Sequence, residues 1–334
     1  MYNEKFHHTD LSKLSFLVTG GAGFIGSNLV DYLMKYNAGK VRVLDNLSEG
    51  KLANIENHLG HPNFEFIEGD IRNLDTCMEA CEGIDFVSHQ AALGSVPRSI
   101  KNPVATNEAN VCGFVNMLTA AKDKGVKRLV YASSSSVYGD SPKLPKKEEE
   151  IGNALSPYAV SKYVNELYAA VFGKTYGIEL IGLRYFNIFG PKQNPNGPYA
   201  AVIPLFVDML LDNEPPYING DGEQTRDFTF VENAVQANIR SLFSDHPQAV
   251  GKVYNVALGE RISINELFET LKEYTNSSIK AKYRAEREGD VRDSLADTSL
   301  AEELIGYEPK IKVKEGLAIT LEWYIAERNK EKVG

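Results

Sequence analysis

Apolar residues along the chain form short runs that alternate with longer amphipathic stretches. Six runs have the length and composition of strands: 14–19, 40–45, 64–67, 84–89, 128–132 and 179–184. Strands that alternate with helices in this way form right-handed βαβ crossovers, which build a parallel sheet with helices on both faces. The pattern therefore predicts an α/β fold, a Rossmann-type doubly wound parallel sheet.

The regular alternation of strands and helices ends after about residue 187, where turns such as FGPKQNPNGPY and NGDGEQTRD separate shorter elements. We expect short strands at 217–219 and 253–257 and helices near 201–212, 231–244, 264–275 and 314–328. Ser263 is the expected N-cap of the third of these helices, with Glu266 completing a capping box. The chain is thus predicted to form a dinucleotide-binding domain (1–187) and a smaller α/β substrate-binding lobe (188–334), with some crossing between them.

The composition of the chain excludes several classes of partner. Its net charge of −9, without any cluster of lysines or arginines, argues against a nucleic-acid or anionic-membrane surface. No apolar run reaches the roughly 18 residues needed to cross a bilayer, and the polar start MYNEKFHHTDLSK lacks the apolar segment of a signal peptide. We therefore expect a cytoplasmic protein that binds neither nucleic acid nor membrane.

Cysteine and histidine give no sign of a metal site. Cys77, Cys81 and Cys112 are spaced for neither a disulfide framework nor a metal centre, and the six histidines form no ligand set. We predict no metal.

A glycine-rich segment ends the first apolar run. Gly20, Gly23 and Gly26, in GGAGFIG, are suited to a tight turn, to the close approach of a pyrophosphate, and to close helix–strand packing. The GxxGxxG spacing differs from the GxGxxG of most dehydrogenases, and an ordinary loop is the alternative interpretation. Asp45, nineteen residues beyond Gly26 at the end of the second run, favours NAD because its carboxylate would bind a ribose and repel a 2′-phosphate.

Further polar residues follow the later runs. Asp70 and Ile71 follow the third run, 89–92 follow the fourth, and the serines 133–136 follow the fifth. Because ligands of such sheets bind beyond the carboxyl ends of the strands, these residues are expected to share one site.

Tyr158 and Lys162 open a helical stretch and lie one turn apart on one face, with Pro157 at the first helical position. A fixed ammonium stabilises a phenolate, so the pKa of Tyr158 is expected to fall from about 10 toward neutrality. Such a phenol can exchange a proton with an alcohol. The YxxxK pattern alone also fits a surface helix; the dinucleotide loop and the serines favour the catalytic interpretation.

The motifs GGAGFIG, YASSSSVYG, SPYAVSKYVNE and RYFNIFGP together resemble those of the extended short-chain dehydrogenase/reductase family. The resemblance, which covers residues 14–326, is to its nucleotide-sugar 4-epimerases and most to the UDP-N-acetylglucosamine 4-epimerases. It implies a tightly bound NAD that is not consumed, and catalytic roles for Ser134, Tyr158 and Lys162. In the implied reaction Tyr158 takes the O4 proton of the sugar while C4 is oxidised; Ser133 and Ser135 leave an ambiguity of one residue for the hydroxyl.

The same resemblance implies the remaining site residues. The cofactor site is expected to contain Gly20, Gly23, Phe24, Ile25, Gly26, Asp45, Asn46, Ser48, Gly50, Asp70, Ile71, Gln90, Ala91, Ala92, Asn110, Tyr158, Lys162 and Tyr185. The UDP-sugar site is expected to contain Gly94, Ser95, Ser134, Ser135, Asn187, Val202, Tyr217, Asn219, Arg226, Arg287, Asp290 and Ser294. Two structural interpretations stay open: Tyr217 as a core aromatic, and Arg226 as a local partner of Asp227.

Two features depart from the pattern of the galactose-type epimerases and bear on the identity of the substrate. Ser294 stands where galactose-restricted relatives carry a tyrosine, which leaves room beside C2 for an N-acetyl group. The segment ALGSVPRS, with Gly94, Ser95 and Arg98, is similar to that of the N-acetylated-substrate group.

Three rival interpretations remain. The first is another enzyme of the same scaffold, a sugar 4,6-dehydratase or a uronate decarboxylase; the dehydratases carry an Asp-Glu pair where Ser135 and Ser136 stand in this chain. A UDP-uronate or UDP-N-acetyl-uronate 4-epimerase is harder to exclude, because an arginine such as Arg98 could meet a carboxylate. A non-catalytic NAD-binding protein would commonly lack the Tyr158 and Lys162 pair.

The resemblance also implies a homodimer. In the family, the helices corresponding to 103–123 and 156–176 pair into a four-helix contact, and here both are apolar on more than one side. The alternative is that they merely cover the sheet.

Overall fold

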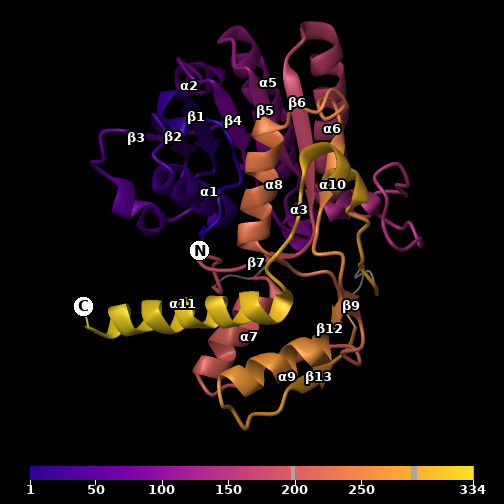
Figure 1. The fold of residues 1–334 in the computed structure, drawn as a ribbon. Helices are drawn as coiled ribbons and strands as arrows, with labels where there is room; N and C mark the ends of the chain where they lie inside the picture. Colours follow the sequence, from indigo (N-terminus) through magenta and orange to yellow (C-terminus); the bar gives the residue numbers. More distant parts are fainter. Residues whose placement is uncertain (197–199, 287–291, 334) are drawn as a thin grey trace.

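Seven parallel strands form the central sheet of the larger lobe (Figure 1). The computed structural model describes residues 1–196, 200–286 and 292–333, and it orders the strands β11-β6-β5-β4-β1-β2-β3. They are β1 (Ser15–Thr19), β2 (Lys40–Asp45), β3 (Phe64–Glu68), β4 (Phe86–His89), β5 (Arg128–Ser134), β6 (Glu179–Tyr185) and β11 (Val253–Val256). The order reverses between β1 and β4, so the ligand-binding switch point lies beside these strands. The predicted Rossmann-type fold is confirmed.

Helices cover both faces of this sheet. One face carries α1 (Phe24–Lys35), α8 (Val231–Phe243) and α10 (Ser299–Ile305), and the other carries α2 (Leu74–Ala80), α5 (Gly113–Asp123) and α6 (Pro157–Tyr176). Successive residues of β1 separate accordingly, because side chains of a strand alternate between faces. Phe16 and Val18 belong to the first core and Leu17 to the second.

The stretch predicted as one helix, 103–123, is interrupted. It consists of α4 (Pro103–Asn107), one π-helical turn η4 (Glu108–Cys112), and α5, and it follows the short α3 (Val96–Lys101). Such turns frequently mark functional positions. This one carries Asn110.

The smaller lobe contains α7 (Val202–Leu211), α9 (Ile264–Tyr274) and α11 (Val313–Val333), which runs beneath the larger lobe in Figure 1. Its core includes Phe206, Phe268 and Leu317. Ser263 is the N-cap of α9, as predicted: its hydroxyl accepts from the Glu266 amide. Three two-stranded sheets complete the lobe: β7 (Ile188–Phe189) with β10 (Thr229–Phe230), β8 (Tyr217–Asn219) with β13 (Lys282–Arg284), and β9 (Thr225–Arg226) with β12 (Ile262–Ser263).

Short 3-10 turns make up the remaining elements: η1 (Leu11–Lys13), η2 (Leu52–Asn54), η3 (Glu56–His58) and η5 (Ser135–Tyr138). Three elements that follow residue 187, namely α8, β11 and α10, pack on the larger lobe. The boundary at residue 187 stays a prediction. Of the helices within the described ranges, none is long and apolar enough to cross a membrane.

Candidate active site

The glycine-rich loop joins β1 to α1 in a conformation that depends on its glycines. Gly20 has a φ of 66°, in the left-handed region that suits glycine. A Cβ at Gly26 would lie 2.1 Å from the Gly20 carbonyl oxygen, so helix and loop approach too closely for any side chain. Gly23 is the N-cap of α1, and a Cβ there would meet the Gly20 carbonyl oxygen at 3.1 Å. The loop at the start of α1 therefore leaves little room for side chains, and the predicted contact of a pyrophosphate with it stays a prediction.

Asp45 lies at the end of β2 with its carboxylate beside this loop. Its Oδ2 accepts from the Ala22 amide and its Oδ1 from the Leu47 amide, each at 2.9 Å. Burial raises the pKa of Asp45, and the backbone hydrogen bonds oppose this change. Next to it, Asn46 donates to Asp70, whose pKa falls to about 2 chiefly because of its hydrogen bond with Arg72. The carboxylate needed for an adenosine ribose is thus held in place.

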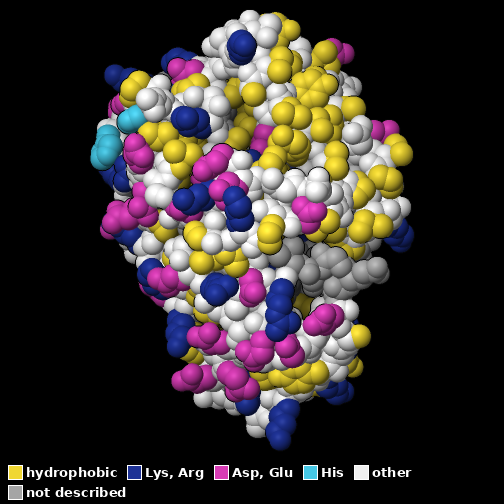
Figure 2. Space-filling model, turned by 90° about the vertical axis from the view of Figure 1, so that its right-hand side faces the viewer, with side chains coloured by type: hydrophobic (Ala, Val, Ile, Leu, Met, Phe, Trp, Pro, Cys, Tyr) yellow, Lys and Arg dark blue, Asp and Glu magenta, His cyan; other side chains and the backbone are white. Residues whose placement is uncertain are grey.

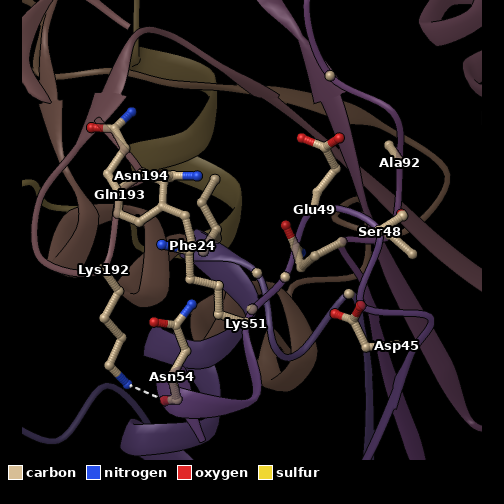
Figure 3. A pocket seen from close by; sticks show the side chains of 18 of the residues that line it. Phe24, Asp45, Ser48, Glu49, Lys51, Asn54, Ala92, Lys192, Gln193 and Asn194 are labelled. Carbon is tan, nitrogen blue, oxygen red and sulfur yellow. Dashed lines mark hydrogen bonds between the residues drawn. The ribbon is translucent and has the colours of Figure 1, made fainter. Parts of the chain in front are cut away.

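A cleft of about 1290 Å³ runs from this loop between the two lobes. It gathers the predicted cofactor residues from five strand ends, and Figure 3 shows Asp45, Ser48 and Ala92 on one side. The predicted cofactor residues that line it are Gly20, Gly23, Phe24, Ile25, Gly26, Asp45, Asn46, Ser48, Gly50, Asp70, Ile71, Gln90, Ala91, Ala92, Tyr158, Lys162 and Tyr185.

Asn110 is not among the described residues that line the cleft. Its side-chain oxygen accepts from the Leu93 amide at 2.7 Å, and its nitrogen donates to the Leu93 carbonyl and to Ser161 Oγ, both at 3.1 Å. These bonds use its amide to hold the loop after β4 against α6. The predicted contact with the cofactor stays a prediction.

The catalytic candidates meet on one wall of the cleft, which Tyr158, Lys162 and Ser134 all line. The Lys162 ammonium donates to the Ala132 carbonyl at 2.8 Å and lies 6.0 Å from the centre of the Tyr158 ring. Ser134 Oγ accepts from Ser136 Oγ at 2.9 Å.

The neighbouring serines are placed differently. Ser133 also lines the cleft, but its side chain is buried and its hydroxyl donates to Glu166 at 2.5 Å. Ser135 begins η5 and is not among the described cleft-lining residues. This placement supports Ser134 as the candidate hydroxyl.

The expected fall in the pKa of Tyr158 is wrong for this structure. Burial raises the pKa of Tyr158, and a hydrogen bond with Ser134 opposes this change. Burial also lowers the pKa of Lys162 to about 8, opposed by the Glu166 carboxylate. The prediction failed because helical spacing shows which groups share a face but not how deeply both are buried, and burial favours the neutral form of each.

The predicted substrate residues divide into two groups. Gly94, Ser134 and Asn187 line the cleft, and Asn187 donates to the Asp227 carbonyl at 3.0 Å. Ser95 caps α3 by accepting from the Arg98 amide, and Val202 begins α7. Neither of these is among the cleft-lining residues that the structure describes.

Further predicted substrate residues lie on the smaller lobe outside the described cleft lining. Tyr217 is 44% exposed, so the structure does not support the core interpretation, and its ring lies 5.7 Å from Lys282 Nζ. Asn219 accepts from Arg284 Nε at 2.5 Å. The Ser294 amide donates to the Thr225 carbonyl at 3.1 Å. Arg287 and Asp290 lie outside the described residues.

Arg226 donates to the carbonyls of Thr225 (2.9 Å) and Arg292 (3.0 Å). Asp227 instead accepts from the amides of Leu258 and Gly259. Burial raises the pKa of Asp227 to about 6.

Sequence reasoning missed the residues that line the cleft from the loop after β7 and from α11. Lys192 donates to Asp31 at 2.6 Å and to the Asn54 carbonyl at 2.8 Å, a bond drawn in Figure 3, and so joins the two lobes. Gln193 and Asn194 follow it into the cleft, and α11 contributes Trp323 among others. The motif RYFNIFGP ends just before this loop, and the pattern of α11 indicated a helix without indicating what it faces.

Metal ligands do not gather anywhere in the described chain: no three His, Cys, Asp or Glu side chains lie close enough together to hold an ion.

A doubly wound sheet with a dinucleotide loop, and with Ser134, Tyr158 and Lys162 on the cleft wall beside it, defines a short-chain dehydrogenase/reductase of the extended type. The chain belongs to the NAD-dependent epimerase/dehydratase family, which it matches over residues 16–257.

Individual relatives match nearly the whole chain. A UDP-glucose 4-epimerase of Mycolicibacterium smegmatis is 36% identical over 94% of this chain and 98% of its own. A UDP-N-acetylglucosamine 4-epimerase from Methanobrevibacter ruminantium, solved with UDP-N-acetylmuramic acid, is 43% identical over 94% of this chain and 99% of its own, with a TM-score of 0.89. A UDP-glucuronic acid 4-epimerase from Bacillus cereus, solved with NAD, is 29% identical over 94% of this chain and 100% of its own, with a TM-score of 0.87.

The residues present fit NAD, the cofactor of the family. The loop at the start of α1 carries no side chains at Gly20, Gly23 and Gly26, and Asp45 lines the same cleft with a carboxylate that could accept from a ribose hydroxyl. Gly50 lies beside this carboxylate. A Cβ there would lie 2.9 Å from Asp45 Oδ2, so the position has little room for a side chain.

Proposed function

We propose that this protein catalyses the reversible C4 epimerisation of UDP-GlcNAc and UDP-GalNAc through a 4-keto intermediate, with NAD retained between turnovers. UDP-Glc and UDP-Gal are the second substrate pair in this proposal. The observation that carries it is that Tyr158, Lys162 and Ser134 line the same cleft as the dinucleotide loop. The 43% identity with the Methanobrevibacter ruminantium UDP-N-acetylglucosamine 4-epimerase supports the N-acetylated pair.

The protein's own groups are placed to move a proton at the sugar O4. Bound NAD supplies a hydride acceptor and donor for C4. Tyr158 takes the O4 proton and returns it after the sugar has turned, while Ser134, its hydrogen-bond partner, holds O4. Lys162 places positive charge one helical turn away and orients the nicotinamide ribose. Burial raises the pKa of Tyr158 and the hydrogen bond with Ser134 opposes this change, so in this proposal Ser134 favours the phenolate that takes the O4 proton.

A site that serves both epimers must hold the nucleotide firmly and the hexose loosely. In this proposal Asn187, Arg226 and Arg287 bind the diphosphate, because a guanidinium fork suits phosphate oxygens. Asp290 binds the uridine ribose, and Tyr217, Asn219 and Val202 contact the uracil. Gly94, Ser95, Ser135 and Ser294 leave space and polar contacts for the acetamide.

A UDP-uronate 4-epimerase is the second candidate, supported by the similarity to the Bacillus cereus enzyme. A C6 carboxylate would need a cation beside the hexose. Lys162 already donates to the Ala132 carbonyl, and Arg98 is bound to Glu49 at 2.5 Å. This pairing favours an uncharged hexose.

The test is an assay of purified protein with the N-acetylated, plain and uronic UDP-sugars, without added reductant. We expect nucleotide to be released on denaturation and UDP-GlcNAc to be converted into UDP-GalNAc. Tyr158→Phe should lower turnover at least about 100-fold, as loss of a general acid–base commonly does. Tyr176→Phe, on the exposed end of the same helix, is the matched control and should retain activity. Normal turnover by Tyr158→Phe would refute the assignment, and exclusive conversion of uronates would favour the second candidate.

We also propose a homodimer formed through α6 and its neighbours. Val160, Leu167 and Val171 form an exposed stripe on α6, and Val104 of α4 is 65% exposed. Figure 2 shows hydrophobic side chains gathered over the larger lobe on this side of the molecule. By contrast Phe114, Met117 and Leu118 of α5 are fully buried, so they cover the sheet.

Light scattering after size exclusion tests this assembly. A patch of this kind is typical of interfaces, so Val171→Glu should give a monomer. Leu59→Glu, also exposed but near η3, is the control and should remain dimeric. A monomeric parent protein would contradict the proposal.

A further inference from the structure

A buried ion pair lies directly behind the end of β5. Glu166 Oε1 accepts from Ser133 Oγ at 2.5 Å and from Arg184 Nε at 2.9 Å, and its Oε2 accepts from Arg184 Nη2 at 2.8 Å. The side chains of Glu166 and Arg184 are 7% and 4% exposed. The proton transfer proposed above does not use this pair.

The pair connects the helix and the strand that carry the catalytic candidates. Glu166 lies on α6, one turn beyond Lys162, and Arg184 is the register partner of Ser133 across β5 and β6. Lys162 binds the Ala132 carbonyl and Glu166 binds the Ser133 hydroxyl. Two successive turns of α6 therefore hold two successive residues of β5, which fixes Ser134 relative to Tyr158.

Arg184 is itself anchored on its other side. Its Nη1 donates to the Glu148 carbonyl at 2.8 Å, and its guanidinium lies 4.8 Å from the centre of the Tyr138 ring. The fork therefore cannot follow Glu166 if the helix shifts. A buried ion pair is commonly no more stabilising than well-packed apolar residues, so stability alone does not account for one at this place.

The carboxylate also acts electrostatically on the site. Burial lowers the pKa of Lys162 to about 8, and Glu166 opposes this by raising it. Without the carboxylate the pKa of Lys162 would be lower still, so a larger fraction of the lysine would be neutral near pH 8.

Two other titratable groups near the pair carry no charge near pH 8, so few charges act on the pKa of Lys162. Burial lowers the pKa of His89 to about 3 and raises that of Tyr138 to about 12, so both are neutral near pH 8. His89 of β4 and Tyr158 of α6 lie near Lys162, Tyr131 of β5 lies near Glu166, and Tyr138 of η5 and Glu148 of the segment before α6 lie near Arg184. Arg184 of β6 is the cation in contact with Glu166.

We propose that Glu166 is a positioning residue of the active site: its contacts with Ser133 and Arg184 fix the end of β5 against α6, and its carboxylate lies one helical turn from Lys162. The inference rests on the proposed function only in that Ser134 and Lys162 act in the proton transfer. Glu166 itself touches none of the reacting atoms in this scheme.

The test compares Glu166→Gln with the neutral double variant Glu166→Gln/Arg184→Met, which leaves no unpaired buried charge. NMR of protein carrying [ε-¹³C]lysine follows the titration of Lys162, whose signal is assigned with Lys162→Arg. In both variants we expect the midpoint, near pH 8 in the parent, to fall by about one pH unit or more. The alkaline limb of kcat/KM should move with it.

Glu179→Gln is the matched control. Glu179 pairs with Arg128 at the opposite end of the same two strands, with Arg128 Nη2 2.7 Å from Glu179 Oε2, so the change removes a more exposed ion pair of the same strands far from the site. Its Lys162 midpoint should equal that of the parent. Glu166→Asp keeps the charge but is one methylene shorter, so it should keep the midpoint and lower kcat more than it changes KM.

Unchanged Lys162 midpoints in both Glu166 variants would overturn the proposal and leave the pair a purely structural one. Failure of the neutral double variant to fold would overturn it as well, because the pair would then be required by the fold itself. The titration needs no turnover. Absence of epimerase activity would therefore contradict the proposed function without obscuring the result for Glu166.

Discussion

Gly23 and Gly26 differ in what a side chain would meet, and this difference separates packing of the loop from binding of the dinucleotide. A Cβ at Gly26 would lie 2.1 Å from the Gly20 carbonyl oxygen and 2.8 Å from Gly21 Cα. A Cβ at Gly23 would meet the Gly20 carbonyl oxygen at 3.1 Å. Alanine should therefore lower the free energy of unfolding more at Gly26 than at Gly23.

The expected magnitudes follow from these distances. At Gly26 the new methyl is more than 1 Å inside the ordinary contact distance of 3.4 Å, so α1 and the loop must separate. Overpacking of this kind costs about 1–3 kcal/mol in the free energy of unfolding. Gly23→Ala should cost about 1 kcal/mol, the typical size of an N-cap change. In the proposed NAD site the pyrophosphate would approach the backbone at Gly23, so the methyl should lower the affinity for NAD at least about tenfold, or 1.4 kcal/mol.

Urea unfolding of nucleotide-free protein measures the stability, and titration calorimetry measures the Kd for NAD. Gly173→Ala is the control, because a Cβ there has an ordinary contact of 3.5 Å with the Ile178 carbonyl oxygen, and it should leave the affinity unchanged. Parent-like stability of Gly26→Ala would refute the packing argument. Parent-like affinity of Gly23→Ala would refute the role assigned to that glycine.

Three further predictions address the rest of the cleft. Ser134→Ala should lower turnover about 100-fold, whereas Ser135→Ala, which in our proposal loses only a polar contact with the acetamide, should lower it much less, as measured by the epimerase assay. Asp45→Asn should narrow the preference for NAD over NADP in binding titrations, because it removes the charge that repels a 2′-phosphate. In the parent protein kcat/KM should decline above about pH 8, because Lys162 loses its proton as the pH rises through its lowered pKa; an alkaline limb unchanged to pH 10 would contradict this reading.

The sequence predicted the strands well because each is a compact apolar run. β1, β2, β5 and β6 begin within one residue of the predicted runs, and β5 extends two residues further, to Ser134. A local pattern cannot reveal pairing partners, however. The run near 253 was correctly predicted as a strand, but only the structure shows that Val253–Val256 pairs with β6 at the edge of the large sheet.

The sequence motifs predicted which residues line the site, but not the properties that depend on how deeply those residues are buried. The glycines and Asp45 lie on the cleft because strand, turn and helix follow from local chemistry. The π-helical turn at Glu108–Cys112 leaves the apolar pattern intact, so no sequence pattern indicated that the Asn110 amide binds Leu93. The raised pKa of Tyr158 likewise depends on surrounding elements that no spacing rule describes.

The two faces of helix α6 have different roles: one contacts the end of β5 at the site, and the other is exposed on the surface. Tyr158, Lys162 and Glu166 recur every four residues and all face inward, toward the end of β5. Val160, Leu167 and Val171 lie on the opposite side, exposed, where we place the partner subunit. Because the inward contacts bind the helix to Ala132 and Ser133, and the outward side chains take no part in them, the helix can accept a partner without moving the phenol. The geometry of proton transfer is therefore set within one chain, and the dimer would stabilise the helix that carries it.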